Sequence, residues 1–289
     1  MKDKIMSLKE AVELFVEDGD LVGIGGLSFW RKAGAATREI IRQKRKNLGG
    51  ISFVGGICAD MLIGAGCLDR IRTSFIGMEL FGLAPNHRRA VGAGQLKVIE
   101  ESEASIALGL KAIYLKLPFL PLRGILESDV LKVREDMKEF NCPLTGDKLV
   151  ACPPIQVDVA IIHVPYADEK GNGNVQGPVW LDDDLAKTAK KTIVTCERIV
   201  ETEDIIHYQG KGQIPMQTVD AVVKVPFGAH PTSCYPFYTY DADAIMKYIN
   251  YCQTPEGYKE YEKEYIALPT QEEYLEKIGG IKEILKILL

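Results

Sequence analysis

The sequence predicts an α/β fold in which a mostly parallel sheet carries helices on both faces. Short apolar runs alternate with amphipathic segments along nearly the whole chain, and several of these runs end in glycines. Strands that alternate with helices are typical of a parallel sheet, because each parallel crossover needs a returning helix. The 289 residues are 46% hydrophobic and 26% charged, which is the ordinary balance of a globular protein.

The first half of the chain supplies the clearest alternation. Ser7 followed by Glu10 is a capping-box pattern, and the apolar residues behind it fall on one helical face. Glycine turns follow two of the strands, and Leu117-Pro118 stops a helix. Strands are predicted over residues 21–26, 51–56, 71–77 and 95–102, and helices over 35–46 and 104–116.

The second half shows the same alternation of strands and helices. Strands are predicted over 157–164, 192–200 and 218–226, and a helix that begins with acids and ends with bases over 181–191. The chain is helical from about residue 242, and its tyrosines at 248, 251, 258, 261 and 265 are predicted to form a packing face. Residues 147–156 are the best candidate for a domain boundary between the two halves of the chain, and we call them the predicted seam. Their Pro-Pro pair also fits a turn, so we predict one continuous domain over residues 1–289.

Charge and cysteine content exclude several classes of protein. A formal net charge of -5 gives no electrostatic attraction to nucleic acid or to an anionic membrane. Charges interrupt every apolar window of residues 1–15, so we expect neither a signal peptide nor a membrane span, and a cytoplasmic protein. The seven cysteines form no C-x-x-C pair, so we predict buried thiols and no metal site.

A glycine-rich turn after the first strand is the first candidate binding site. Gly25 and Gly26 end the run LVGIGG (21–26) just before a predicted helix. Glycines there let backbone N–H groups approach an oxyanion or a phosphate closely. The pattern is not the dinucleotide fingerprint, because Ser28 stands where the third glycine would be. The alternative is a tight turn that binds no ligand.

Basic residues near this turn are further candidates. Arg31 and Lys32 either hold the phosphates or a carboxylate of a ligand, or form a solvated pair. Arg123 follows the apolar run 117–122, and it either snorkels to the surface or binds an anion. We interpret His163 and His230 as hydrogen-bonded structural residues; the alternatives are a base at His163 and an interface or substrate role for His230.

Acidic residues follow the strand predicted over residues 95–102. Glu100, Glu101 and Glu103 lie where α/β sheets place ligands, and a carboxylate is a suitable nucleophile for acyl transfer. Glu103 is either a catalytic group or an acid that favours the start of a helix. If Arg123 binds an anion, it would form a compact pair with Glu103. Glu79 and the cluster at residues 87–89 fall in a predicted loop over residues 77–94 and are candidates for shaping a pocket.

Five ordered segments carry a family resemblance, and the run G-A-H-P-x-x-C-Y is the most specific of their motifs. Together they resemble the alpha (A) subunit of glutaconate CoA-transferase, a family I CoA-transferase. The segments are residues 20–41, 109–124, 157–164, 190–200 and 219–241.

The resemblance implies the family I CoA-transferase fold and a beta subunit of related fold, in a heterodimer or heterotetramer with the active site at the interface. A glutamate of the partner, in an S-E-N-G motif, would attack the acyl-CoA and then carry CoA as a thioester. CoA would move from a donor to an acceptor carboxylate, with no bound cofactor or metal. Gly25, Gly26, Ser28, Arg31 and Arg123 would contact the substrate.

Two rival functions remain open. The chain also resembles the alpha-type (A) chain of a hydrolase that opens a cyclic CoA thioester in steroid-ring breakdown, where a glutamate of that chain reacts. Ser102-Glu103-Ala104 is similar to the start of S-E-N-G but lacks its Asn-Gly, which makes Glu103 the candidate for that chemistry. The third hypothesis is a non-catalytic scaffold for a catalytic beta subunit.

Overall fold

A nine-stranded sheet forms the centre of the molecule in the computed structural model, which describes residues 4–207 and 212–288. Most of its strands pair in parallel, in the order β12-β10-β8-β1-β2-β3-β4, and the short strands β9 and β11 add antiparallel pairs at the end of β8. The predicted mostly parallel sheet is therefore confirmed. The strands are β1 (Leu21–Ile24), β2 (Leu48–Gly55), β3 (Leu68–Ile76), β4 (Lys97–Glu100), β8 (Val159–Ala167), β9 (Gly173–Val175), β10 (Lys191–Ile199), β11 (Gly212–Ile214) and β12 (Ala221–Lys224).

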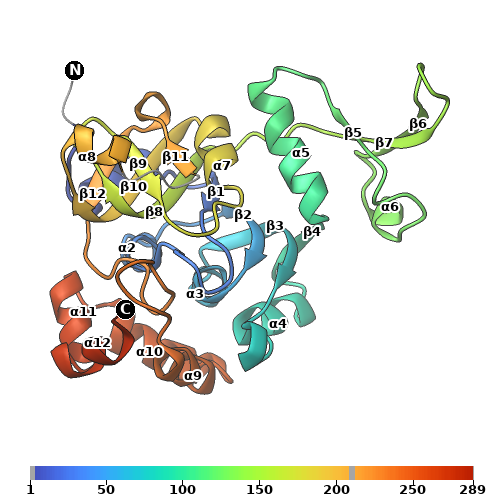
Figure 1. The fold of residues 1–289 in the computed structure, drawn as a ribbon. Helices are drawn as coiled ribbons and strands as arrows, with labels where there is room; N and C mark the ends of the chain where they lie inside the picture. Colours follow the sequence, from blue (N-terminus) through green and yellow to red (C-terminus); the bar gives the residue numbers. More distant parts are fainter. Residues whose placement is uncertain (1–3, 208–211, 289) are drawn as a thin grey trace.

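Helices cover both faces of this sheet, as predicted (Figure 1). Neighbouring residues of β8 show the two faces: Ile161 belongs to one apolar cluster and Ile162 to the other, because strand side chains alternate. Both are fully buried, which explains the continuous apolar run of this strand. The first cluster is covered by α1 (Leu8–Phe15), α2 (Gly34–Arg42) and α3 (Ile57–Gly64), and the second by α5 (Glu103–Tyr114) and α7 (Asp182–Thr188).

The segment predicted as a loop over residues 77–94 contains a helix, so that prediction is wrong in its second half. The helix α4 (Pro85–Gly92) begins with proline at its first position, where no N–H is needed. The buried carboxylate of Asp60 accepts a hydrogen bond from the backbone N–H of His87 at 2.7 Å and satisfies this helix start. Residues 77–84, which include a short 3₁₀ turn (Glu79–Phe81), and the turn at residues 93–94 are the parts of this segment outside the helix.

A small antiparallel sheet lies apart from the central one (Figure 1). It has its own apolar cluster, formed by Ile125, Met137 and Val150. The predicted seam at 147–156 includes the central strand of this sheet, so it is not a simple linker. The single-domain boundary stays a prediction. The elements are β5 (Leu120–Leu122), α6 (Val130–Val133), β6 (Lys138–Asn141) and β7 (Lys148–Cys152).

The last part of the chain forms helices beside the α2–α3 face, drawn in orange and red in Figure 1. Four of the five tyrosines predicted to form a packing face are buried, and Tyr251 packs partly buried against them. That prediction is confirmed. The elements from residue 202 on, apart from the strands given above, are α8 (Thr202–His207), a 3₁₀ turn (Met216–Thr218), α9 (Ala242–Tyr251), α10 (Pro255–Tyr261), a π-helical turn (Glu262–Ile266), α11 (Gln271–Lys277) and α12 (Ile281–Ile287).

Two further findings bear on the sequence predictions. The cysteines are all free, and only Cys142 is not buried, which confirms the predicted buried thiols for the other six. Among the described residues, no helix combines the length and the apolar character that crossing a membrane requires.

Candidate functional site

The carboxyl ends of β1 to β4 meet at one edge of the sheet, which is where α/β folds bind ligands. The turn after β1 is the most constrained part of this edge. Gly26, Ser28 and Arg31 all have positive φ angles, of 74°, 46° and 51°. Leu27 and Trp30 each donate a backbone hydrogen bond to the carbonyl of the other, at 3.0 and 2.7 Å. We call residues 25–31 the glycine turn.

Both predicted glycines of this turn are required by close contacts within the chain. A Cβ at Gly25 would lie 2.4 Å from Oδ1 of Asp182, and a Cβ at Gly26 would lie 2.1 Å from the carbonyl oxygen of Trp30. Neither position accepts a side chain without displacing a buried neighbour or the backbone of the turn. The glycines therefore serve first to let the chain approach itself closely.

The amide groups predicted to receive a ligand anion already have partners in this chain. The N–H of Gly25 donates to the carbonyl of Ile161 at 2.9 Å. The N–H of Gly26 donates to Oδ1 of Asp182 at 2.7 Å. A carboxylate from α7 thus occupies the place where the sequence predicts an oxyanion. Substrate contact through Gly25 and Gly26 stays a prediction.

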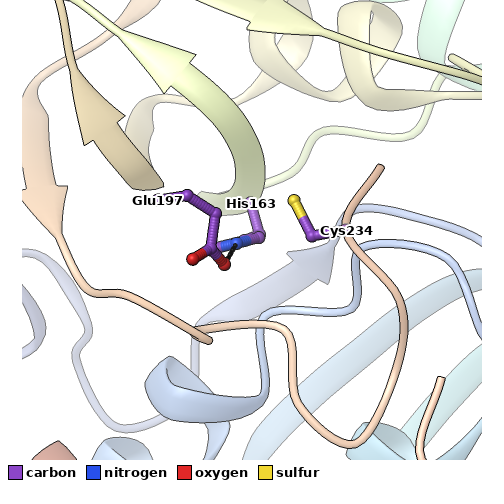
Figure 2. Close-up of side chains that lie close together, drawn as sticks. All are labelled: His163, Glu197 and Cys234. Carbon is purple, nitrogen blue, oxygen red and sulfur yellow. Dashed lines mark hydrogen bonds and ion pairs between the residues drawn. The ribbon is translucent and has the colours of Figure 1, made fainter. Parts of the chain in front are cut away.

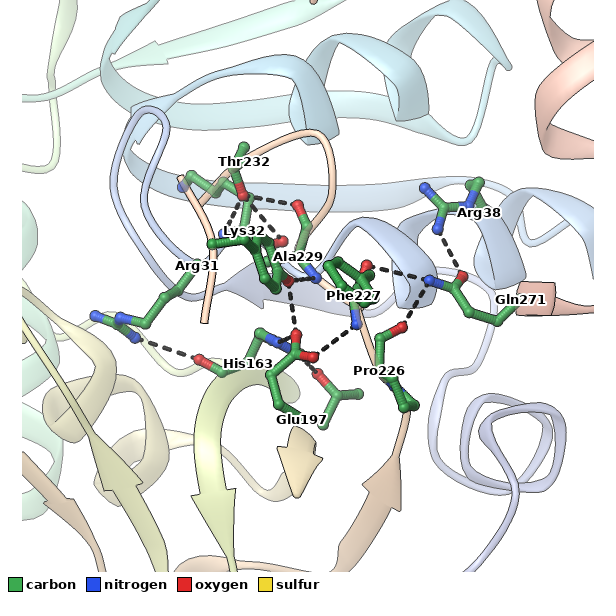
Figure 3. A network of polar contacts seen from close by, with 12 residues as sticks. Arg31, Lys32, Arg38, His163, Glu197, Pro226, Phe227, Ala229, Thr232 and Gln271 are labelled. Carbon is green, nitrogen blue, oxygen red and sulfur yellow. Dashed lines mark hydrogen bonds and ion pairs between the residues drawn. The ribbon is translucent and has the colours of Figure 1, made fainter. Parts of the chain in front are cut away.

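Arg31 is fully buried and belongs to the same group of charges. Its guanidinium donates to Oδ2 of Asp182 at 2.8 Å, to the carbonyl of His163 at 3.3 Å and to the carbonyl of Pro178 (the contact to His163 is drawn in Figure 3). The solvated pair considered for Arg31 and Lys32 is wrong, because their exposed fractions are 0% and 1%. Substrate binding by Arg31 stays a prediction, and it requires the guanidinium to leave Asp182.

Lys32 contacts the same glycine as Asp182, through the carbonyl group of that glycine. Its Nζ donates to the carbonyl oxygen of Gly26 at 3.0 Å and to Oγ of Ser52, on β2, at 3.3 Å. Burial lowers the pKa of this ammonium group to about 8, an effect that nearby Cys58 and Asp182 partly offset. The side chain is therefore an internal support and not a surface cation.

The tip of the glycine turn meets the connection after β3. Oγ of Ser28 donates to a carboxylate oxygen of Glu79 at 2.5 Å. Glu79 itself has a positive φ of 48°, and a Cβ at Gly56 would lie 3.1 Å from the carbonyl of Ser28. The ends of β1, β2 and β3 thus form one continuous edge, on which Ser28 is partly exposed. Substrate contact by Ser28 stays a prediction that this position permits.

Two aromatic side chains beside this edge were not singled out from the sequence. The rings of Phe53, on β2, and Trp180 lie 6.1 Å apart, and Trp180 is 48% exposed. Trp180 lies just before α7, so it is carried by the segment that supplies Asp182. An isolated aromatic residue in a sequence gives no signal for this placement, since the pairing joins segments far apart in the chain.

The three candidate glutamates after β4 have different surroundings. Glu101 is buried, pairs with Arg72 and with Arg134 (2.6 Å), and accepts a hydrogen bond from Oγ of Ser105 at 2.5 Å. Its carboxylate is therefore committed to structure. Glu100 and Glu103 are exposed, and Glu103 is the first residue of α5. A catalytic role for Glu103 stays a prediction.

Arg123 lies on the small antiparallel sheet and not at the edge described above. It follows β5, its side chain is 65% exposed, and it pairs with Asp147 at 2.8 Å. The compact pair with Glu103 is not formed, because the ion pair of Arg123 is made within the small sheet. Substrate binding by Arg123 stays a prediction.

A buried polar network centred on Glu197 lies beside the glycine turn and reaches it through His163, whose carbonyl accepts from Arg31 (Figure 3). Glu197 accepts hydrogen bonds from the backbone N–H of Phe227 (2.6 Å) and the hydroxyl of Tyr238 (2.6 Å), and contacts Nε2 of His163 (2.8 Å). Nδ1 of His163 contacts Oγ1 of Thr195 at 2.9 Å. These contacts agree with the interpretation of His163 as a structural residue.

The G-A-H-P-x-x-C-Y run, residues 228–235, lies directly against the glycine turn and the start of α2. The backbone N–H of Arg31 donates to the carbonyl of Ser233 at 2.8 Å, and a Cβ at Gly34 would lie 2.4 Å from the carbonyl of His230. The ring of His230 contacts Tyr274 (2.8 Å) and Asp241 (3.0 Å). His230 therefore has the hydrogen-bonding role expected of it.

One group of side chains has the composition of a metal site. Ligand atoms of His163, Glu197 and Cys234 lie within 4.8 Å of one another, and all three residues are buried (Figure 2). Both ring nitrogens of His163 already contact protein oxygens, so a metal ion would have to displace these contacts. We therefore assign the group to the buried network. The three residues are far apart in the sequence and only the fold brings them together. No C-x-x-C spacing therefore indicated this group.

Comparisons with known proteins agree with this architecture. Residues 5–225 match the family model described as Coenzyme A transferase. The A subunit of glutaconate CoA-transferase from Acidaminococcus fermentans is 36% identical over 97% of this chain and 93% of its own length. The crystal structure of glutaconate coenzyme A-transferase from that organism superposes with a TM-score of 0.93 and 34% identity, covering 99% of this chain and 96% of that one.

Two other relatives extend the comparison. An uncharacterized protein of Archaeoglobus fulgidus is 38% identical over 99% of this chain, which spans only 65% of that protein's length. The cholesterol ring-cleaving hydrolase IpdA subunit of Rhodococcus jostii is 30% identical, over 92% of this chain and 93% of its own. On the family match and the near-complete alignment with a CoA-transferase subunit, the chain belongs to the coenzyme A transferase family.

Proposed function

We propose that this chain is the alpha subunit of a heteromeric CoA-transferase, which moves CoA from an acyl-CoA to an acceptor carboxylate together with a beta subunit. The observation that carries the proposal is the similarity to the A subunit of glutaconate CoA-transferase over nearly the whole of both chains. In the net reaction one thioester breaks and one forms. The donor acid leaves as a carboxylate, so no oxidant or reductant is consumed.

The geometry supports a half-site that needs a partner. The sheet edge offers a fixed glycine turn with a partly exposed Ser28 at its tip. The best-positioned buried carboxylates near this edge, Glu101 and Asp182, are both held by arginines. A nucleophilic carboxylate must be free to attack the thioester carbonyl. The partner's glutamate that the resemblance implies would supply it, and the chain's own residues would orient the thioester.

A second candidate is the ring-opening CoA-thioester hydrolase. Two observations are compatible with it: the similarity to the ring-cleaving hydrolase subunit, which is lower than that to the CoA-transferase subunit, and the exposed Glu103 at the first position of α5. In that reaction the reactive carboxylate would be on this chain and no acceptor acid would be needed.

The two functions predict opposite results for Glu103→Gln in the complex of this chain with its beta-type partner. For a transferase we expect turnover only with an acceptor carboxylate, and a rate in the variant within about twofold of wild type, since an exposed surface substitution costs little. Initial rates of acyl-CoA consumption, with and without a panel of acids, measure both points. The matched control is Glu100→Gln.

Consumption of acyl-CoA without any acceptor, together with loss of at least about a hundredfold in the Glu103 variant only, would contradict the transferase and establish the hydrolase. Activity that is independent of both Glu103 and an acceptor would contradict both.

A further inference from the structure

We propose that Lys32 and Asp182 are positioning residues that hold the Gly26 residue through its N–H and its carbonyl and thereby fix the glycine turn against the acyl thioester. The inference rests on the proposed acyl-transfer function. It adds a role for two buried groups that are remote from the tip of the turn.

The contacts fall on both polar groups of one residue. The N–H of Gly26 donates to Oδ1 of Asp182 at 2.7 Å, and the carbonyl of Gly26 accepts from Nζ of Lys32 at 3.0 Å. The second oxygen of Asp182 is held by Arg31, and the second contact of the Lys32 ammonium is Ser52. Gly26 is thus linked through its N–H to α7, and through its carbonyl and Lys32 to β2.

Burial makes these contacts strong determinants of geometry. The exposed fraction is 1% for both Lys32 and Asp182, and 0% for Arg31. Charge-assisted hydrogen bonds away from water are short and directional, and a charged group buried without its partner is costly. A backbone held in this way has a fixed orientation, which is what a preorganised acyl-transfer site requires.

The backbone that follows Gly26 is also anchored. The N–H of Lys32 donates to Oγ1 of Thr232 at 3.0 Å, and Ser233 donates from its backbone N–H and its hydroxyl to the carbonyl of Phe29, at 2.7 and 2.8 Å. The base of the turn is therefore rigid. The orientation of Gly26 is the part that Lys32 and Asp182 decide, and Ser28 follows two residues later at the open edge.

The test is steady-state kinetics of the complex with its beta-type partner, using the acyl-CoA and acceptor acid that the wild type converts. Asp182→Asn and Lys32→Met are the test variants. Asp183→Asn, one residue along the same helix and paired with Lys187 near the surface, and the exposed Lys46→Met are the matched controls. We expect kcat to fall by about a hundredfold in both test variants with KM changed less than about threefold, because misplacing a reacting group costs about that much. The controls should stay within about twofold.

A pH profile separates positioning from a merely structural role. The charged groups that face Lys32 are Asp182 from α7 and Arg31 from the turn, and the thiol of Cys58 faces it from α3. Since burial brings the pKa of Lys32 to about 8, wild-type kcat should decline above that pH as the ammonium loses its proton. The decline should persist in Cys58→Ser and be absent from Lys32→Met.

If either test variant does not fold, a milder variant still tests the positioning role. Ser52→Ala keeps the amine and removes one of its acceptors, and we expect kcat about threefold to tenfold lower with unchanged copurification of the partner. Wild-type kinetics in all variants that fold, Ser52→Ala included, would overturn the positioning role while leaving the proposed function intact. A wild-type complex that transfers no CoA would instead overturn the proposed function.

Discussion

Replacing Gly26 by alanine is expected to lower kcat/KM of the complex by about a hundredfold or more, the cost of misplacing reacting groups. The new Cβ would lie 2.1 Å from the carbonyl oxygen of Trp30 and 2.7 Å from the carbonyl carbon of Arg31. Both are backbone atoms, so the turn must open to make room. The φ angle of 74° adds strain of about 1–2 kcal/mol for any residue with a side chain.

The chain offers a control that separates the two effects. Gly66 has a φ of 70°, and a Cβ built there meets nothing within 4 Å. Gly66→Ala should therefore lower the free energy of unfolding by about 1–2 kcal/mol and leave kcat/KM unchanged. Parallel kinetics and thermal unfolding of the two variants measure this, and equal activity of both would contradict the importance of the turn's geometry.

Glu197→Ala is expected to lower the free energy of unfolding by about 3–5 kcal/mol, since each buried donor left unsatisfied costs about 1–3 kcal/mol. The carboxylate is 5% exposed and accepts from the hydroxyl of Tyr238 and the N–H of Phe227, besides its contact with His163. The substitution leaves these buried donors without their acceptor. The side chain thus joins β8, β10 and the chain after β12.

Urea unfolding of the complex, followed by tryptophan fluorescence, measures the change. The exposed Glu201 lies four residues further on, and Glu201→Ala should change the free energy by less than about 0.5 kcal/mol. A Glu197 variant as stable as the Glu201 variant would show that the network beside the glycine turn contributes little to folding.

The sheet and most helices follow from local patterns, because strands buried on both faces and amphipathic helices leave distinct signals. The run of β8 is apolar at Ile161 and Ile162 alike because each faces a different layer of helices. The elements that the sequence patterns did not predict lack such a signal. The helix α3 is apolar at nearly every position, so it has no periodicity, and the strands of the small sheet are short and partly exposed.

The glycine turn was predictable in place, but its contacts were not. Glycines at the end of a strand marked the turn correctly, whereas the burial of Arg31 depends on Asp182, 151 residues away. In the sequence Asp182 is one of three consecutive acids, all of which suit a helix start. Only the packing of α7 against the turn distinguishes it from Asp183, which lies nearer the surface.

The most direct test of the account is to trap the covalent intermediate on the complex of this chain with its beta-type partner. The complex is incubated with an acyl-CoA and no acceptor, treated with borohydride or hydroxylamine, and each of the two chains is read by mass spectrometry. For the proposed transferase we expect an adduct at a glutamate of the partner and an unmodified alpha chain. An adduct on this chain at Glu103, or no adduct together with acyl-CoA consumption without an acceptor, would contradict it.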